Sequence, residues 1–136
     1  LIPGQVKFSI DLRNVNDELL NKMHEDMLAF IDKTSAETGL PVKIERVSYY
    51  PPCPFHPDCV GAVRKATEKL GYSTMDVVSG AGHDAIYAAR VAPAGMIFVP
   101  CKDGISHNEI EDAKKEHLEA GCNVLLHAML ERAGTV

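Results

Sequence analysis

The chain has 136 residues, of which 46% are hydrophobic and 24% charged, so we expect a globular fold rather than a disordered chain. Its formal net charge of -5 provides no basic surface for a phosphate backbone, which argues against a nucleic-acid partner. No apolar run approaches the ~18 residues that a bilayer-spanning helix needs, so we expect no membrane partner either.

The first 50 residues predict a β-α-β arrangement. Residues 6–13 alternate apolar and polar side chains, which is typical of a strand with one buried face. A helix is predicted next, because Asn14 and Asn16 are N-cap candidates and an apolar helical pattern continues until Gly39, a good C-cap residue. The alternation then returns over residues 41–50, which predicts a second strand.

A proline-rich stretch separates this part from the rest of the chain. Four of the seven residues 51–57 are proline, which lacks an amide donor and restricts the residue before it. Neither a helix nor a central strand continues through such a stretch. We therefore expect two parts, residues 1–50 and residues 51–136.

The second part alternates predicted helices with short apolar segments. Asn108 with Glu111 forms a candidate capping box for a last helix, whose expected packing side contains Leu118, Cys122, Leu125, Leu126 and Met129. Helices that alternate with short buried strands indicate an α/β layer structure. The predicted elements are a helix at 58–70, a strand at 75–78, a turn at 80–82, a helix at 84–90, a strand buried on both faces at 95–100 and a long helix at 110–132.

The four cysteines do not indicate a zinc ribbon or a disulfide framework. Cys53, Cys59, Cys101 and Cys122 form no C-x-x-C pair, and the chain is not rich in cysteine. We therefore expect reduced thiols and a cytoplasmic location. Cys59 and Cys122 fall on helical patterns beside apolar residues, where we expect them to fill small spaces in the core.

Two loops that follow predicted strands contain candidate functional groups. The first is the segment 79–85, Ser-Gly-Ala-Gly-His-Asp-Ala, whose glycines would let a ligand approach the backbone and whose helix N-terminus could hold a carboxylate. A dinucleotide site is excluded, because no β-α-β unit with an acidic residue ~20 positions later follows. The alternative is a sharp strand-to-helix turn in which Asp84 caps the helix.

The second loop, residues 102–109, contains His107. In open α/β sheets the loops beyond the carboxyl ends of strands form the ligand crevice, and both His83 and His107 are expected there. Imidazole is a common metal ligand and acid–base group, and Asp103, Asn108 or Glu109 could orient the ring of His107. The alternative is a loop histidine that caps the last helix, and the residues alone do not separate the two.

The remaining candidates are weaker. Arg13 ends the first predicted strand on the face opposite Phe8, where a surface cation is the expected role and a fork for a substrate carboxylate is the functional alternative. The other histidines are expected to be surface or packing residues: His24, His56, His117 and His127.

Three ordered motifs together resemble a known family. These are the run from Pro3 to Arg13, the segment 79–85, and the strand 96–100 with the loop Gly-Ile-Ser-His-Asn-Glu at 104–109. They are similar to the amidase, hydantoinase/carbamoylase family, which belongs to the zinc-peptidase clan. Its members include N-carbamoyl-L-amino-acid hydrolases, β-ureidopropionases and allantoate amidohydrolases.

This resemblance implies an α/β fold in two parts. Residues 1–50 would be the second half of an α+β lid and dimerisation domain, and residues 51–136 the C-terminal segment of a zinc-peptidase-like catalytic α/β domain. The chain would then be a C-terminal fragment of an enzyme whose other metal ligands and acidic general base lie in a preceding segment.

The resemblance also implies roles for four residues. His107 matches the last ligand of a site for two divalent metal ions, which zinc, manganese, nickel or cobalt would suit. Arg13 matches the arginine that binds the substrate carboxylate, and Gly82 matches a backbone position that contacts substrate, with His83 beside it.

The implied reaction is hydrolysis of the carbamoyl C–N bond of N-carbamoyl-L-amino acids or related ureido acids, by a homodimer formed through the lid. The motifs do not separate these small-molecule substrates from one another. The chain alone is expected to be inactive. A stand-alone module that binds or dimerises without catalysis is the alternative.

Overall fold

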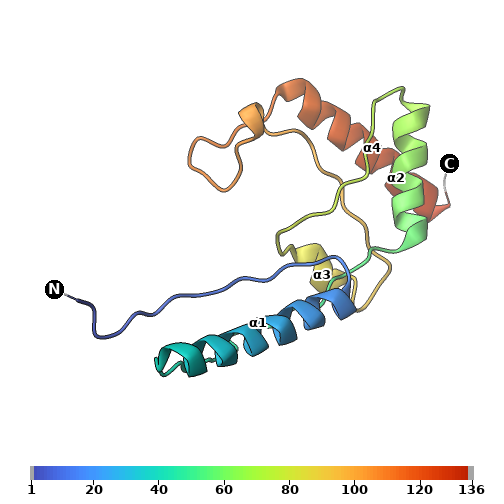
Figure 1. Cartoon of the computed structure of the whole chain (residues 1–136). Helices are drawn as coiled ribbons and strands as arrows, with labels where there is room; N and C mark the ends of the chain where they lie inside the picture. The colour runs from blue at the N-terminus through green and yellow to red at the C-terminus, as the bar shows by residue number, and fades with distance from the viewer. Residues whose placement is uncertain (1, 135–136) are drawn as a thin grey trace. The chain divides into compact units, whose positions relative to one another are not determined.

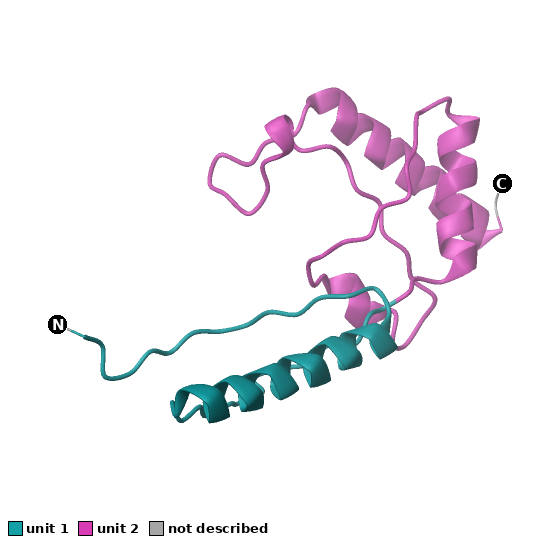
Figure 2. Ribbon diagram, in the orientation of Figure 1, with its two compact units in different colours: residues 1–53 teal, residues 54–136 magenta. Residues whose placement is uncertain are grey.

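The computed structural model describes residues 2–134 as helices joined by extended segments (Figure 1). The chain divides into two compact units, unit 1 over Leu1–Cys53 and unit 2 over Pro54–Val136 (Figure 2). None of the helices among the described residues is long and apolar enough to cross a membrane. In chain order the helices are α1 (Asp17–Thr38), α2 (Pro57–Lys69), α3 (Asp84–Ala88), the 3₁₀ helix η1 (Lys102–Gly104) and α4 (Lys115–Ala133).

Both ends of α1 in unit 1 are set by local sequence, as predicted. The side chain of Asn16 accepts a hydrogen bond from the backbone N–H of Leu19 at 2.9 Å, which satisfies one of the free amides of the first turn. Gly39 ends the helix at φ 70°, and its N–H donates to the carbonyl of Ser35 at 2.9 Å. Because the two predicted cap residues are the observed ones, the predicted ends of α1 agree with the structure.

The segment after α1 is tied to the start of the same helix. Tyr49 donates its phenolic hydrogen to the carboxylate of Asp17 in the first helical turn. That hydrogen bond is the main reason why the pKa of Tyr49 is raised above its ordinary value. Leu20, one turn into α1, is the buried residue of this helix.

The predicted strands are wrong for the part of the chain that the structure describes. Within residues 2–134 no strand forms, and the pairing that is present is an isolated antiparallel bridge between Cys101 and Ala113. The α/β class is therefore supported for its helices and not for its sheet. The segments concerned are residues 6–13, 41–50, 75–78 and 95–100.

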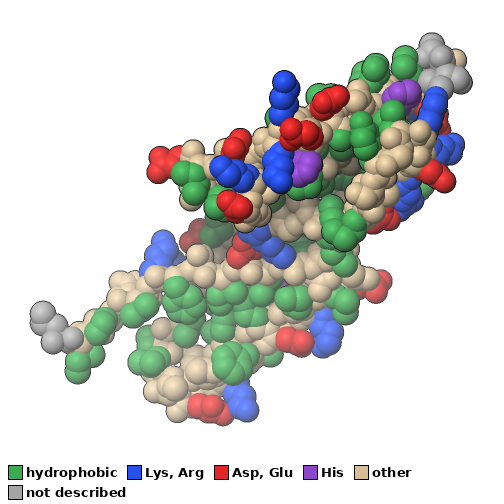
Figure 3. Space-filling view, turned by 90° about the horizontal axis from the view of Figure 1, so that it is seen from above, with side chains coloured by type: hydrophobic (Ala, Val, Ile, Leu, Met, Phe, Trp, Pro, Cys, Tyr) green, Lys and Arg blue, Asp and Glu red, His purple; other side chains and the backbone are tan. Residues whose placement is uncertain are grey.

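The physical reason is that alternating apolar and polar residues indicate a segment with one apolar face. They do not identify the neighbouring segment that would pair with it. A strand requires a neighbouring segment whose N–H and C=O groups complete the hydrogen-bond ladder. Here the segment 6–13 is extended, but 72% of Val6 and 76% of Phe8 are exposed. Figure 3 shows hydrophobic side chains, in green, gathered on the surface of unit 1.

Unit 2 is built on the contact between α2 and α4. The buried residues at this contact are small, namely Ala62, Ala66, Val124 and Ala128, so the two helices approach closely. Val63, Leu70 and Ile97 pack against this cluster from its margin. The cluster is the hydrophobic core of unit 2.

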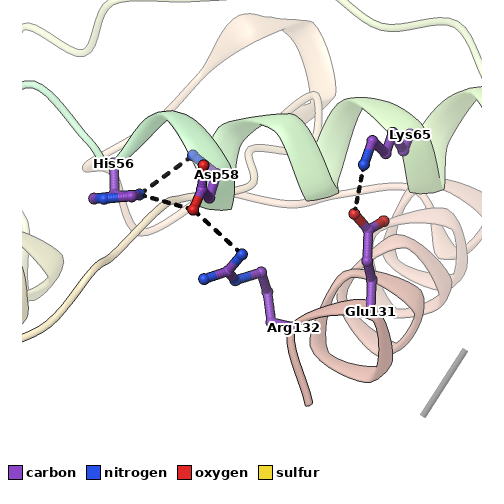
Figure 4. A network of polar contacts seen from close by, with 5 residues as sticks. All are labelled: His56, Asp58, Lys65, Glu131 and Arg132. Atoms are coloured by element: carbon purple, nitrogen blue, oxygen red, sulfur yellow. Dashed lines mark hydrogen bonds and ion pairs between the residues drawn. The ribbon is translucent and has the colours of Figure 1, made fainter. Parts of the chain in front are cut away.

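Polar pairs flank the same contact (Figure 4). Lys65 of α2 lies 2.9 Å from Glu131 of α4, and Arg132 of α4 lies 3.5 Å from Asp58 of α2. His56 accepts the N–H of Asp58 at its Nδ1 atom, at 3.2 Å, and so caps α2. All of these groups except the half-buried Glu131 are exposed, so the ion pairs add little stability.

The extended segment 95–100 lies against both helices. A Cβ atom on Gly95 would come within 3.1 Å of the Cβ atom of Cys59 in α2, and one on Gly121 of α4 would come within 2.7 Å of Val99 Cγ1. The expected burial on both faces is nevertheless wrong, because Phe98 is 48% exposed. The segment packs on one side.

The last helix begins later than predicted. α4 starts at Lys115, with Lys114 as its N-cap residue, whereas the sequence predicted a start at Ile110 and a capping box at Asn108. The side chain of Asn108 accepts instead from the N–H of Ile110, at 3.2 Å, and forms a local turn. Asn108 is a turn residue in the structure.

The packing side of α4 was also predicted wrongly. The side that meets α2 presents Val124 and Ala128, and the predicted stripe is exposed, with Leu125 at 50% and Met129 at 61%. Cys122, expected in the core, is exposed as well, while Cys59 is half-buried. All four cysteines lie among the described residues as free thiols.

Candidate functional site

His107 lies on a loop that is closed at its base. The bridge between Cys101 and Ala113 joins the two ends of the loop, and the N–H of Lys102 donates to the carbonyl of Asp112 at 2.7 Å. The ammonium of Lys102 lies 3.8 Å from the carboxylate of Asp112. In Figure 1 this segment, residues 101–113, is the orange loop that projects from unit 2 before α4.

The backbone of His107 adopts a left-handed conformation, with φ at 56°. For a residue with a Cβ atom this conformation costs on the order of 1 kcal/mol, so a compensating interaction is expected. The N–H of His107 supplies it by donating to the Oε2 atom of Glu111 at 2.7 Å. Both side chains are exposed.

Among the described residues the imidazole of His107 makes one side-chain hydrogen bond, between its Nδ1 atom and the Oγ atom of Ser106 at 3.4 Å. In the described part of the chain, the ring is not hydrogen-bonded to Asp103, Asn108 or Glu109, the residues expected to orient it. The alternative role is wrong too: His107 does not cap the last helix, because α4 begins eight residues later.

The described residues do not form a complete metal site. Among them no three histidine, cysteine, aspartate or glutamate side chains come together as a group that could hold a metal ion. His107 by itself offers what a single ligand needs, which is an exposed imidazole on a braced loop. The residues present therefore fit one position in a metal site.

His83 is the second histidine of unit 2 singled out by the sequence. Its Nε2 atom lies 2.6 Å from the Oγ atom of Ser79, and its ring meets Phe98 edge-on at 5.5 Å. It is the N-cap residue of α3 but makes no side-chain capping bond. The alternative in which Asp84 caps this helix is wrong, because Asp84 is the first helical residue.

Gly82 precedes His83 on the same turn. A Cβ atom built on Gly82 would meet nothing within 4 Å, and its φ lies outside the positive range that favours glycine. Neither backbone conformation nor internal packing therefore requires glycine here. The space over its backbone is open to a ligand.

Arg13 lies in unit 1 and forms an ion pair with Asp11, two residues earlier on the same face of the extended segment. Nε of Arg13 donates to both carboxylate oxygens, at 3.1 and 3.2 Å, and Nη2 donates to Oδ2 at 2.5 Å. This hydrogen bonding raises the pKa of Arg13 and lowers that of Asp11. Arg13 is exposed and already holds a carboxylate in its fork.

The structure thus places Arg13 in unit 1, and Gly82, His83 and His107 on two loops of unit 2. No hydrogen bond joins His83 to His107 among the residues that the structure describes. Glu111 is the residue of this region whose contact sequence reasoning missed. Its carboxylate was assigned to a helix cap, whereas it binds the backbone of His107.

Comparison with known proteins identifies what the chain resembles. Residues 4–131 match peptidase family M20/M25/M40. Among curated proteins, the chain is 46% identical over 136 residues to an N-carbamoyl-L-amino-acid amidohydrolase of Rhizobium meliloti, covering 100% of this chain and 33% of that protein. It is 35% identical over 133 residues to an allantoate amidohydrolase of Bacillus subtilis (strain 168), covering 98% of this chain and 32% of that protein.

Solved structures agree with these relatives. An amidase of the hydantoinase/carbamoylase family from Burkholderia multivorans matches with a TM-score of 0.84 and 53% sequence identity, over 88% of this chain and 29% of that one. The chain therefore spans about a third of the length of the relatives it matches. The predicted resemblance to hydantoinase/carbamoylase amidases is confirmed, and the chain belongs to peptidase family M20/M25/M40.

Proposed function

We propose that this chain is part of a metal-dependent amidohydrolase that hydrolyses the carbamoyl C–N bond of N-carbamoyl-L-amino acids or related ureido acids. The observation that carries the proposal is the 46% identity to an N-carbamoyl-L-amino-acid amidohydrolase over all 136 residues. That match includes both unit 2 loops and the Arg13 segment. An identity of this extent over the whole chain favours a shared chemistry over a non-catalytic module.

We further propose how the two units serve such an enzyme. Residues 1–50 would be the second half of a lid and dimerisation domain, and residues 51–136 the C-terminal segment of the catalytic α/β domain. The exposed alternating segments of unit 1, such as residues 6–13, would then pair with strands from the rest of a longer protein. This arrangement predicts a homodimer joined through the lid. The free thiols of the four cysteines are the basis for proposing a cytoplasmic location.

In the proposed site His107 is one ligand of a centre for two divalent ions, with zinc, manganese, nickel or cobalt as candidates. Such ions, when bound, supply an activated water and a polarised carbonyl. His107 would contribute one ligand to that centre, an exposed imidazole on the closed loop 101–113. The remaining ligands and the general base would come from outside this chain.

The other candidates would position the substrate. Arg13 would exchange its contact with Asp11 for the substrate carboxylate, since a guanidinium fork binds both in the same way. The open space over Gly82 would admit the amide portion of the substrate next to the backbone. His83, held by Ser79, would line the same turn.

A substrate panel with the intact, metal-loaded protein tests this proposal. N-carbamoyl-L-amino acids, β-ureidopropionate and allantoate would be compared with a dipeptide, and ammonia and free amine would be measured separately. Hydrolysis of a carbamoyl compound consumes one water and yields ammonia, carbon dioxide and the amine in equal amounts. We expect ammonia from at least one ureido acid, and cleavage of the dipeptide alone would contradict the proposal.

A further inference from the structure

We infer that Glu111 is a positioning residue for His107: its carboxylate holds the backbone N–H of His107 and thereby fixes where the imidazole projects. The inference rests on the proposed function, in which His107 is a metal ligand. It adds a residue that touches neither metal nor substrate but on which the ligand geometry depends. Nothing in the spacing of the loop sequence alone indicates this contact.

The backbone conformation of His107 requires a restraint. A φ of 56° is unusual for a residue with a side chain, and it turns the chain sharply at the position of the candidate ligand. The N–H of His107 points to Glu111 Oε2 at 2.7 Å, a short bond of the charge-assisted kind. Without this acceptor, no hydrogen bond from the N–H of His107 to Glu111 would offset the cost of the left-handed backbone conformation.

Glu111 is itself held in place. Its backbone N–H donates to the carbonyl of Asn108 at 2.9 Å, which makes a turn between the two residues. Its neighbour Asp112 accepts the N–H of Lys102 at 2.7 Å at the base of the loop. The carboxylate of Glu111 therefore extends from the braced returning side of the loop to His107 on the other side.

The imidazole of His107 has few hydrogen-bond restraints of its own. It is exposed, and within the described part of the chain its side-chain hydrogen bond is the 3.4 Å contact with Ser106. A ring with so few polar partners is positioned chiefly by its backbone. A ligand that must meet a metal within a few tenths of an ångström needs such a fixed backbone.

Three variants of the intact protein test the inference. Glu111→Ala removes the acceptor, and Glu111→Gln keeps an oxygen acceptor without the charge. Glu109→Ala is the matched control, since Glu109 is an exposed carboxylate of the same loop for which the described residues show no hydrogen bond or ion pair with His107. Two quantities are measured in each, the hydrogen-exchange protection of the His107 amide in metal-free protein and the dissociation constant for Zn²⁺ alone.

We expect Glu111→Ala to abolish protection of the His107 amide and to raise the Zn²⁺ dissociation constant about 10- to 100-fold. Glu111→Gln should retain most of both properties, and Glu109→Ala should match the wild type. Unchanged amide protection in Glu111→Ala would overturn the inference. Equal losses of Zn²⁺ affinity in the Gln and Ala variants, with the amide still protected in Gln, would also overturn it by making Glu111 a direct ligand.

A fourth variant separates this inference from the function on which it rests. If His107→Ala binds Zn²⁺ as tightly as the wild type, the ligand assignment in the proposed function is wrong, and Glu111 loses its role with it. If His107→Ala weakens Zn²⁺ binding while Glu111→Ala does not, the ligand assignment is supported and Glu111 alone is misassigned.

Discussion

At the scale of single residues, three candidate side chains share one property: each is held by a neighbour close in sequence. Arg13 and His107 are exposed, and His83 is half-buried. Arg13 is held by Asp11, His83 by Ser79 and His107 by Glu111. Local contacts of this kind preset side-chain or backbone positions before any ligand binds, which lowers the entropy lost on binding. The candidate residues could be predicted from the sequence, whereas the residues that hydrogen-bond to them could not.

Arg13→Ala in the intact protein should act through the substrate carboxylate. Losing a charge-assisted hydrogen bond worth ~1.5–3 kcal/mol should raise KM about 10- to 100-fold for N-carbamoyl amino acids. An uncharged amide analogue should be affected little, and initial-rate kinetics on the pair would measure the difference. Lys7→Ala, which removes another exposed cation of the same segment, is the control. Equal losses on charged and uncharged substrates would argue against the assignment.

At the scale of elements, helices were predictable where their signals are local. Asn16 and Gly39 cap α1 as expected, and the start of α2 follows from the Pro57 region. The start of α4 was misplaced because Asn108 and Glu111 use their side chains within the loop instead of at a helix end. The strand predictions were wrong because the hydrogen-bond ladder of a sheet depends on a partner segment. Alternation of apolar and polar residues within one segment does not specify that partner.

The packing of α4 gives a test at this scale. Gly121→Ala should destabilise unit 2, although alanine favours a helix over glycine by ~1 kcal/mol, because its Cβ atom would lie 2.7 Å from Val99 Cγ1. The stiff β-branched side chain cannot rotate away easily, so a net loss of about 1 kcal/mol is expected in urea unfolding.

The matched control is Gly61→Ala in α2, where a new Cβ atom meets nothing within 4 Å and the change should stabilise. Adding Val99→Ala to Gly121→Ala should recover much of the loss caused by the clash. A stabilising Gly121→Ala would show that the segment 95–100 does not pack on α4 in this way.

The ion pair between Arg64 of α2 and Asp76 gives a pH-dependent test. Nε of Arg64 donates to Asp76 at 3.2 Å, and this hydrogen bonding lowers the pKa of Asp76 from its ordinary value of 3.8. Because the folded-state pKa is depressed, the stabilisation is present above pH 3.8 and is lost as the pH falls through the lower folded value.

Asp76→Asn should therefore lower the urea midpoint relative to the wild type at neutral pH. The difference should shrink below pH 3.8, where the wild-type carboxylate also loses its charge. Glu68→Gln, an exposed charge change on α2, is the control. A difference between wild type and Asp76→Asn that stays constant down to acid pH would contradict the ion pair.

At the scale of the whole molecule, the family could be predicted from three ordered motifs, and the match over residues 4–131 confirms it. The metal centre that we propose could not be built from the described residues, because they hold no group of three ligands. The reason is physical: a binuclear site gathers ligands from distant segments. The chain spans about a third of its relatives' length.

The purified 136-residue chain should therefore release no ammonia from N-carbamoyl-L-amino acids, with or without added divalent metal. A single candidate imidazole cannot hold the ions that the proposed hydrolysis needs. An ammonia assay over long incubation, with the intact protein as the positive control, would measure this. Metal-dependent release by the chain alone would show that it carries a complete site.

The most direct measurement is the metal content of the intact protein by elemental analysis, compared with its His107→Ala variant and with His24→Ala as a control histidine. We predict bound divalent metal in the wild type and the control, a marked loss in His107→Ala, and a parallel loss of ureido-acid hydrolysis. Unchanged metal content in His107→Ala would contradict the assignment of His107 as a metal ligand.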